Sequence, residues 1–441
     1  MVEKYLDTVK EHEQNSQNKP LIMSATSKSV SSKTPVSIGI IGSGHRGGTF
    51  INELVKMPEL ARISAICDVS TERMKILTTR FGLKDTKQFT SLDEMLAGNL
   101  VEAVIVTVPD NLHRWAAVKI FEAGKDVMLE KPLAPTAEDC RAILQAHRRS
   151  GRLMQVGFVL RSTSFYRRVK AIVDSGVLGQ IMFIHACEYL GVQHGASYMT
   201  RWHRKRENAG TFLLAKCSHD LDILNWLTGS KPQAVASFGG NDFFLPERGG
   251  AAHCSECERT ETCPYQVDLN WHFITGETRP PGSDLCAFND DKDVIDNQVV
   301  ILEYANRIRA TFELQLFHPV GGRRITIGGQ YGYLEGDFEA GKITIHYNTD
   351  GRIEEITLKA ANDSGHGGGD FEFTRSFVRA IRTRETNSAG AEAGLAANVI
   401  AEAVEQSRLK KCVVPISLLE YAVGSIQGKI QHRKKSKTIR K

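Results

Sequence analysis

The sequence has no apolar run long enough to cross a bilayer. The longest obvious one surrounds residues 104–108, whereas a membrane-spanning helix needs about 20 apolar residues. The first residues mix acids, bases and amides, unlike a secretory signal or a typical transit peptide. No internal repeat is visible. These absences exclude a membrane protein and a repeat array, and they make a cytoplasmic location the expectation.

Cysteine and charge exclude further classes. Nine cysteines, an odd number, without a secretory signal argue against a disulfide framework. Residues 429–441 hold seven Lys or Arg and no acid, so they account for the formal net charge of +5. This basic tail could be a patch for nuclear localisation or for binding a polyanion. The favoured interpretation is a solvated end without such a function. No other feature predicts a nucleic acid or membrane partner.

A glycine-rich turn near the N-terminus carries the strongest functional signal. The apolar segment 36–41 runs into Gly42-x-Gly44-x-x-Gly47 and then into a helical pattern. Glycines at these positions permit a tight turn, close approach of a pyrophosphate, and close packing of helix on strand. A second apolar segment ends at Asp68, where an acidic side chain meets the adenosine ribose. The pattern predicts a dinucleotide site. Asp68 favours NAD, and Arg73 leaves NADP open.

Strand and helix patterns alternate through residues 36–157 and then change character. Strands are expected at 36–41, 62–67, 101–107, 126–130 and 153–157, with helices between them, which predicts a doubly wound parallel sheet. Beyond them, helices at 163–176, 217–228, 370–384 and 391–409 accompany a long run of alternating strand segments. The expected fold is α/β: a Rossmann domain followed by an α+β domain with a large, mostly antiparallel open sheet.

Four segments follow from these patterns. Residues 1–35 form a flexible leader with a short helix near 5–12, and residues 36–157 form the dinucleotide-binding domain. Residues 158–418 form a domain for substrate binding and oligomerisation, and residues 419–441 form the basic tail.

Three further motifs accompany the glycine turn. One strand ends in Thr107-Val-Pro-Asp-Asn-Leu-His113, and the next ends in Glu130-Lys131-Pro132. A later segment carries His219-Asp-Leu-Asp222 followed by Asn-Trp-Leu-Thr-Gly229. Together these motifs resemble the glucose-fructose oxidoreductase, inositol dehydrogenase and MocA (Gfo/Idh/MocA) family over residues 36–418. The resemblance implies a cis Lys131–Pro132 bond and a homodimer or homotetramer built on the open face of the antiparallel sheet.

The chemistry of two of these residues can be argued without the family. Ligands of a doubly wound sheet lie beyond the carboxyl ends of its strands, where Lys131 stands. Oxidising a secondary alcohol requires loss of a proton as the hydride departs, and an ammonium with a neutral imidazole meets that need. Lys131 and His219 are therefore the predicted catalytic pair, and the resemblance assigns them the same roles. Taken singly, a Lys-Pro pair after a strand more often belongs to a surface turn. A histidine at a helix start is more often a helix cap or a solvated side chain.

The resemblance also implies the remaining site residues. For the cofactor it adds His45, Arg46, Thr107, Pro109, Asn111, His113, Glu130 and Lys131 to Gly42, Gly44, Gly47 and Asp68. Lys216, Asp222 and Arg161 are the substrate-binding candidates, with Trp202 and Arg204 consistent with that role. Asn111 is also expected to cap a helix.

One position departs from the family pattern. Family members commonly carry a carboxylate four residues before the histidine, and here that residue is Ala215, followed by Lys216 and Cys217. Lys216 either binds substrate, replaces part of the proton relay through His219, or faces solvent. A glycine-rich segment at 364–370 contains His366, which either reaches the substrate or is merely exposed.

A cysteine cluster is the least expected feature. Cys254, Cys257 and Cys263 lie within ten residues; they either hold a structural zinc with Cys286 or His272 as the fourth ligand, or they are reduced loop thiols. The second interpretation is favoured, and no metal is assigned to the active site.

The leading hypothesis is an NAD(P)-dependent dehydrogenase acting on a sugar, a sugar derivative or a cyclitol. A polar substrate with several hydroxyls suits a cleft that is lined by Lys, His, Asp and Arg. Two alternatives stay open: a glycosidase that uses bound NAD in a transient oxidation followed by elimination, and a non-enzymatic regulator that senses dinucleotide or sugar. Retention of Lys131 and His219 argues against the regulator, which needs no proton relay.

Overall fold

The computed structural model describes residues 34–267, 283–358, 366–385 and 389–417. The leader, the helix expected near residues 5–12, the basic tail and His272 lie outside the described residues. No helix in the described ranges combines the length and apolar character needed to cross a membrane.

The N-terminal sheet is the predicted doubly wound parallel sheet. Its six strands pair in the order β3-β2-β1-β4-β5-β6, the order typical of dinucleotide-binding folds. The strands are β1 (Val36–Ile41), β2 (Ala61–Cys67), β3 (Lys87–Phe89), β4 (Ala103–Val106), β5 (Asp126–Leu129) and β6 (Met154–Val156). The helices between them are α2 (His45–Leu54), α3 (Thr71–Arg80), α4 (Leu92–Ala97), α5 (His113–Glu122) and α6 (Ala137–Ser150).

The second sheet has nine strands and is mostly antiparallel, as predicted. Their order is β14-β13-β12-β11-β7-β10-β9-β8-β15, and β7 with β10 is a parallel pair. The strands are β7 (Ile181–Gly191), β8 (Pro232–Gly240), β9 (Asn297–Tyr304), β10 (Arg309–His318), β11 (Gly322–Gly329), β12 (Gly332–Asp337), β13 (Lys342–Tyr347), β14 (Ile353–Thr357) and β15 (Val414–Pro415). The accompanying helices are α7 (Ser164–Asp174), α8 (Val192–Thr200), α9 (Arg206–Ala209), α10 (Phe212–Thr228), α11 (Gly369–Thr383) and α12 (Ala391–Lys410).

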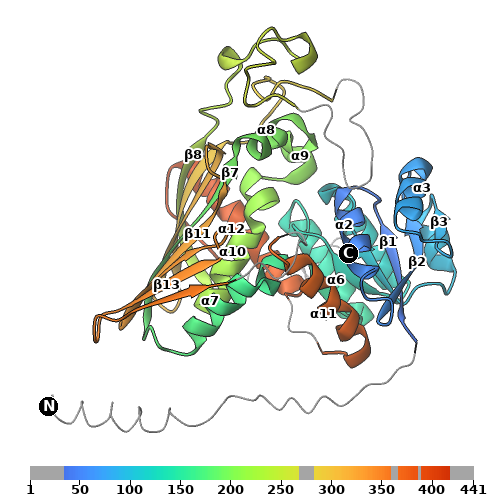
Figure 1. The fold of residues 1–441 in the computed structure, drawn as a ribbon, viewed down its shortest axis with the longest axis horizontal. Coiled ribbons are helices and arrows are strands. Elements are labelled where there is room, and N and C mark those ends of the chain that lie inside the picture. The colour runs from blue at the N-terminus through green and yellow to red at the C-terminus, as the bar shows by residue number, and fades with distance from the viewer. Residues whose placement is uncertain (1–33, 268–282, 359–365, 386–388, 418–441) are drawn as a thin grey trace, which may run out of the picture. The chain divides into compact units, whose positions relative to one another are not determined.

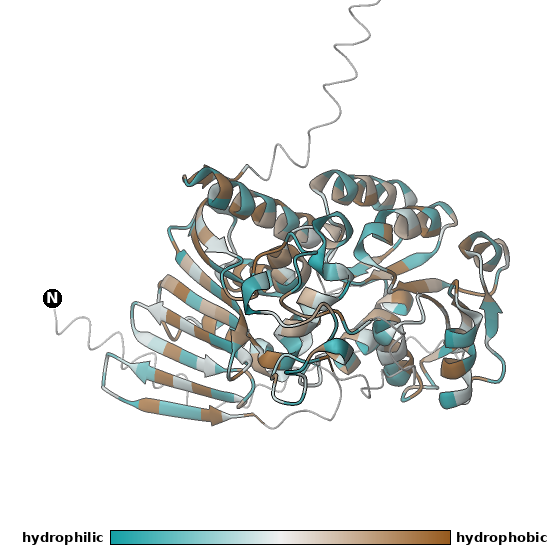
Figure 2. Ribbon diagram, turned by 90° about the horizontal axis from the view of Figure 1, so that it is seen from above, coloured by the Kyte–Doolittle hydropathy of each residue, from teal (hydrophilic) through white to brown (hydrophobic). Residues whose placement is uncertain are grey.

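The strands of this sheet alternate between a buried and an exposed face. In β9, Val300 and Leu302 are fully buried, whereas Val299 and Ile301 on the other face are 47% and 48% exposed. Figure 2 shows the resulting alternation of brown and teal along these strands. Because side chains in a strand alternate between faces, one face packs on the helices and the other stays open.

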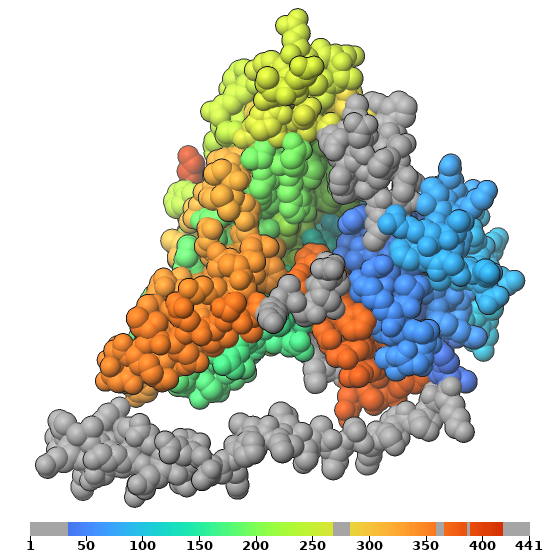
Figure 3. Space-filling view, viewed as in Figure 1, coloured from blue at the N-terminus to red at the C-terminus, as the bar shows by residue number. Residues whose placement is uncertain are grey.

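The last two long helices return to the N-terminal sheet. Phe373 and Phe377 of α11 pack in one apolar cluster with Ile38 of β1 and Phe50 of α2. Figure 3 shows α11, in orange-red, against the blue residues of the N-terminal sheet. Helix α12 packs against both α6 and α10. The parallel sheet therefore obtains part of its cover from residues more than 300 positions further along the chain.

Several elements differ from the sequence expectations. Strands β3, β12 and β15 and helices α4, α8 and α9 were not expected; each is short or too polar to show a clear hydrophobic period. Helix α10 begins at Phe212 instead of 217, because the Thr211 hydroxyl accepts from the Leu214 N–H and caps it there. Gly229, in the left-handed region, ends the helix.

Replacement of Phe377 by alanine tests the contribution of α11. The side chain is fully buried, so we expect Phe377→Ala to lower the free energy of unfolding by about 3–5 kcal/mol through lost burial and a cavity. Denaturant titration followed by circular dichroism measures the change. Leu409→Ala, at a side chain that is 62% exposed, is the matched control, and equal midpoints for the two variants would contradict the packing described.

Candidate active site

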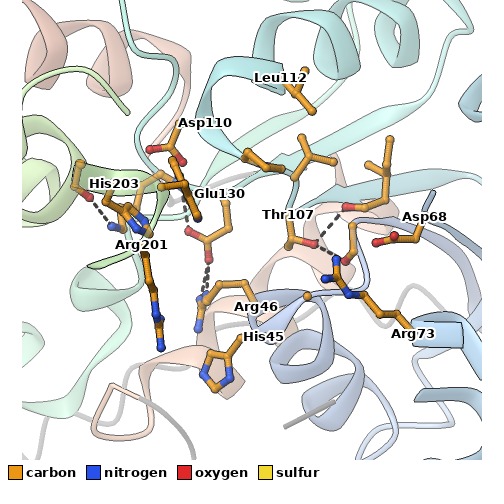
Figure 4. A pocket seen from close by; sticks show the side chains of 18 of the residues that line it. His45, Arg46, Asp68, Arg73, Thr107, Asp110, Leu112, Glu130, Arg201 and His203 are labelled. Atoms are coloured by element: carbon orange, nitrogen blue, oxygen red, sulfur yellow. Dashed lines mark hydrogen bonds and ion pairs between the residues drawn. The ribbon is translucent and has the colours of Figure 1, made fainter. Parts of the chain in front are cut away.

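A cleft of about 1510 Å³ lies along the carboxyl ends of the parallel strands. It is lined by the glycine turn, the ends of β2, β4 and β5, the segment from α8 to residue 203, and α10. Figure 4 shows Asp68 and Arg73 on one side, Arg46 and Glu130 in the middle, and Arg201 and His203 on the other side. The volume exceeds the 300–1,000 Å³ range usual for single small ligands, so it suits a dinucleotide together with a substrate.

The glycine turn has the shape that a pyrophosphate requires. A Cβ on Gly42, whose φ is +97°, would lie 2.7 Å from the Thr107 carbonyl, and one on Gly47 would lie 2.1 Å from the Gly42 oxygen. A Cβ on Gly44 would meet nothing within 4 Å, because that side faces the cleft. Helix α2 begins directly after Gly44 without a side-chain cap or an acid in its first turn. Its free N–H groups are therefore available to an anion.

Asp68 stands at the carboxyl end of β2, where the adenosine ribose is expected. Its carboxylate accepts from the backbone N–H of Ser43, 2.5 Å away, and of Ser70, 2.8 Å away. Asp68 and Arg73 both line the cleft. The two hydrogen bonds fix the position of the acid next to the glycine turn.

Arg46, in the first turn of α2, joins three parts of the chain. Its Nε donates to Glu130 Oε1 at 2.6 Å, and its two terminal nitrogens donate to the Asp370 carboxylate at 2.9 and 3.1 Å. Burial alone would raise the pKa of Asp370, but the charges of Arg46 and His366 and their hydrogen bonds hold it far below its usual value. Asp370 is therefore a buried carboxylate that stays ionised.

Lys131 reaches from the end of β5 towards α10. The Lys131–Pro132 bond is cis, as predicted, and the Lys131 Nζ donates to the Ala215 carbonyl at 2.7 Å. His113 is fully buried behind this turn, with Nδ1 2.8 Å from the Pro132 oxygen and Nε2 3.1 Å from the Val108 oxygen. The imidazole of His113 thus braces the turn that presents Lys131.

His219 lies in the middle of α10, one helical turn after Ala215. It lines the cleft together with Lys131 and is 3% exposed. Burial lowers the pKa of His219 well below its usual value, and the positive charge of Lys131 lowers it further. The ring is therefore neutral at physiological pH. Its Nδ1 has no hydrogen-bond partner among the described residues.

Four charged side chains form a buried cluster behind the cleft. Lys216 of α10 lies 3.0 Å from Glu188 of β7, and Arg323 of β11 lies 2.9 Å from Glu188 and 2.8 Å from Asp220. The sheet register places Arg323 directly opposite Glu188. Two cations and two anions balance, so this buried charge cluster has no net formal charge. Lys216 lines the cleft from one end of the cluster.

The structure brings most of the predicted site residues to the cleft, but not all. Gly42, Gly44, His45, Arg46, Asp68, Thr107, Pro109, Glu130, Lys131, Lys216 and His219 line it. Arg161 and Asp222 instead form a bidentate ion pair at 2.6 Å, with Asp222 1% exposed, and neither is a lining residue. Gly47, Asn111 and His113 also lie outside the lining.

The sequence analysis missed a group of residues between β7 and α10. His194, Tyr198, Arg201 and His203 line the cleft beside Trp202. Burial lowers the pKa of His194 and of His203 to about 3, so both rings are neutral. The many His, Arg and Tyr residues in 194–204 could have indicated a binding segment, but they do not follow the spacing of a known motif.

The cysteine cluster lies apart from this cleft. An isolated antiparallel β-bridge between His253 and Leu285 brings Cys286 close to Cys254. Cys254, Cys257, Cys263 and Cys286 are all free thiols. Within the described ranges no group of His, Cys, Asp or Glu is arranged to hold a metal.

Family models match two segments. Residues 36–158 match a model described as an oxidoreductase family with an NAD-binding Rossmann fold. Residues 170–416 match a model described as the C-terminal alpha/beta domain of an oxidoreductase family. The second match alone covers more than half of the chain.

Individual proteins show the same likeness. The putative oxidoreductase YteT of Bacillus subtilis (strain 168) is 27% identical over 396 residues, which are 81% of this chain and 91% of that protein. An inositol 2-dehydrogenase of Burkholderia cenocepacia (strain HI2424) is 34% identical over 195 residues, which are 44% of this chain and 55% of that protein. Among solved structures, levoglucosan dehydrogenase with NADH and levoglucosan has a TM-score of 0.70 at 18% identity, covering 87% of this chain and 100% of that chain. This structural likeness shows a shared fold.

The buried charge cluster can be tested through Arg323. Arg323→Met leaves Glu188 and Asp220 without their shared cation, so we expect a loss of about 3–5 kcal/mol in the free energy of unfolding. Arg324→Met is the matched control, because Arg324 is half exposed and pairs with Asp337 at 3.4 Å; it should cost less than about 1 kcal/mol. Equal unfolding midpoints for the two variants would show that the cluster does not contribute as described.

Proposed function

The chain belongs to the Gfo/Idh/MocA family of oxidoreductases, and from this premise we propose that it oxidises a secondary hydroxyl of a sugar, a sugar derivative or a cyclitol with NAD. The observation that supports the proposal most is the meeting of Lys131 and His219 in the cleft that also contains the glycine turn. Lys131 comes from the parallel sheet and His219 from the second domain.

Several features of the Rossmann domain suit a bound NAD. The α2 N-terminus and Gly44 suit the pyrophosphate, and Asp68 suits the adenosine ribose. When bound, the nicotinamide supplies the hydride acceptor. The carboxylate of Asp68 disfavours a 2′-phosphate, while Arg73 in the same lining keeps NADP as a candidate to be measured.

Lys131 and His219 supply the groups that the substrate hydroxyl needs. An ammonium within hydrogen-bond reach of the hydroxyl stabilises the oxygen as its proton leaves. His219 lines the same cleft, and its neutral ring has one nitrogen that donates and one that accepts a hydrogen bond. The predominance of His, Arg, Lys and Tyr at this end of the cleft suits a ligand with several hydroxyls better than an apolar one.

A substrate screen tests the proposal. The full-length protein is mixed with NAD or NADP and with sugars, sugar acids and inositols, and the absorbance of the reduced nicotinamide is followed. We expect turnover with at least one polyol and a preference for NAD. Cleavage of chromogenic glycosides without net NADH would instead indicate the glycosidase, and stoichiometric cofactor binding without any turnover would indicate the regulator.

The role of Lys131 can be tested by substitution. Lys131→Met removes the ammonium and keeps the stem, so we expect kcat/KM to fall by about 10²- to 10³-fold while cofactor affinity, measured by calorimetry, stays unchanged. Lys125→Met is the control, because Lys125 lies outside the cleft and donates to Asn99 at 3.1 Å. A rate close to wild type for Lys131→Met would remove the basis of the proposed chemistry.

The open face of the nine-stranded sheet supports a second expectation. Phe183, Phe238, Val299 and Ile301 on this face are 44–65% exposed, and exposed apolar groups of this kind mark association surfaces. We propose that the chain forms a homodimer or homotetramer through it. Sedimentation velocity should show an oligomer, and the double variant Phe238→Lys, Val299→Lys should sediment as a monomer; a wild-type monomer would contradict the proposal.

A further inference from the structure

Within the described residues, no hydrogen bond to Nδ1 fixes the tautomer of the neutral His219 ring. The residue one helical turn before it is Ala215, and its Nδ1 has no hydrogen-bond partner among the described residues. If His219 accepted a proton, the imidazolium would be buried beside the charges of Lys131 and Lys216. A base that becomes charged next to two cations is poorly suited to its task.

A second histidine in the same cleft has the partner that His219 lacks. His366 Nδ1 lies 3.1 Å from Asp370 Oδ2, and the Gly369 N–H donates to the His366 carbonyl at 3.1 Å. Asp370 is fully buried and is fixed by two hydrogen bonds from Arg46. The His366 side chain is one-third exposed, lines the cleft, and has its ring centroid 5.8 Å from that of His219.

His366 adjoins a group of charged side chains with an excess of acid. Arg46 is shared by two carboxylates, Glu130 and Asp370, so this group of three carries one net negative charge. His45 of α2 and His219 of α10 also lie near His366, and burial is the main cause that lowers the pKa of each of these two rings.

We propose that His366, oriented by Asp370, is the catalytic base of this enzyme, and that His219 serves as a neutral hydrogen-bonding group. The inference rests on the proposed dehydrogenase function. In the oxidation, the carbinol C–H bond breaks and its electron pair leaves with the hydride to NAD, while the hydroxyl proton passes to His366 Nε2 and the C–O bond becomes a carbonyl. Asp370 is a positioning residue, because it holds Nδ1–H and stabilises the imidazolium that forms.

Kinetics of matched glutamine variants test the assignment. We expect His366→Gln to lower kcat by about 10²- to 10⁴-fold, with cofactor affinity unchanged, and His219→Gln to lower it by about tenfold or less, the loss of one hydrogen bond. Added imidazole should restore part of the rate of His366→Ala and none of that of His219→Ala. His346→Gln, on the exposed strand β13, is the control. A His366→Gln rate near wild type, or rescue of His219→Ala alone, would overturn the proposal.

A measurement that does not depend on turnover accompanies the kinetics. Long-range ¹⁵N–¹H correlation spectra of the full-length protein report the tautomer of each imidazole. We expect His366 to carry its proton on Nδ1, and Asp370→Asn to shift the ring to a mixture of tautomers. A proton on Nε2 in the wild-type protein would refute the dyad even if no substrate were found, whereas failure of the substrate screen alone would count against the dehydrogenase function and not against the dyad.

Discussion

The guanidinium of Arg46 is the constraint on which the site depends. It extends from the first turn of α2, the helix that follows the glycine turn, and contacts Glu130, the residue before Lys131, and Asp370, the second residue of α11. Glu130 and Asp370 are buried, and Arg46, with 26% of its side chain exposed, lies between them. Loss of this cation would leave two buried acids without their shared partner. The interaction fixes the cofactor turn, the strand end that presents Lys131, and the helix that follows His366 in one geometry.

The second domain builds its side of the cleft by a similar principle. Glu188, Lys216, Asp220 and Arg323 come from two strands and one helix, and they neutralise one another beneath the cleft. Such a cluster fixes the rotation of α10, and with it the direction in which His219 and Lys216 point. No carboxylate stands at the Ala215 position; the acids of this region are Glu188 of β7, Asp220 of α10 and Asp370 of α11.

The sequence was sufficient to predict the elements whose signal is local. The glycine turn, the acid at the end of β2 and both sheet types follow from short patterns of residues, and the structure contains them. The cis Lys131–Pro132 bond, which the family resemblance implied, is also present. The interactions that depend on long-range register could not be predicted. Nothing in the neighbourhood of Glu188 indicates that Arg323 lies opposite it, or that Asp370 meets Arg46. For the same reason Asp222 was expected to face the substrate, although its helix turns it towards Arg161.

The return of α11 to the first sheet bears on how the molecule is made. Residues 36–158 contain a complete set of parallel strands, yet one apolar face of that set, including Ile38 and Phe50, is covered by Phe373 and Phe377. During synthesis, this apolar surface would stay exposed to solvent until nearly all of the chain had left the ribosome. A fragment that contains only the nucleotide-binding half would leave the same apolar surface exposed, so this half depends on α11 for burial of that surface.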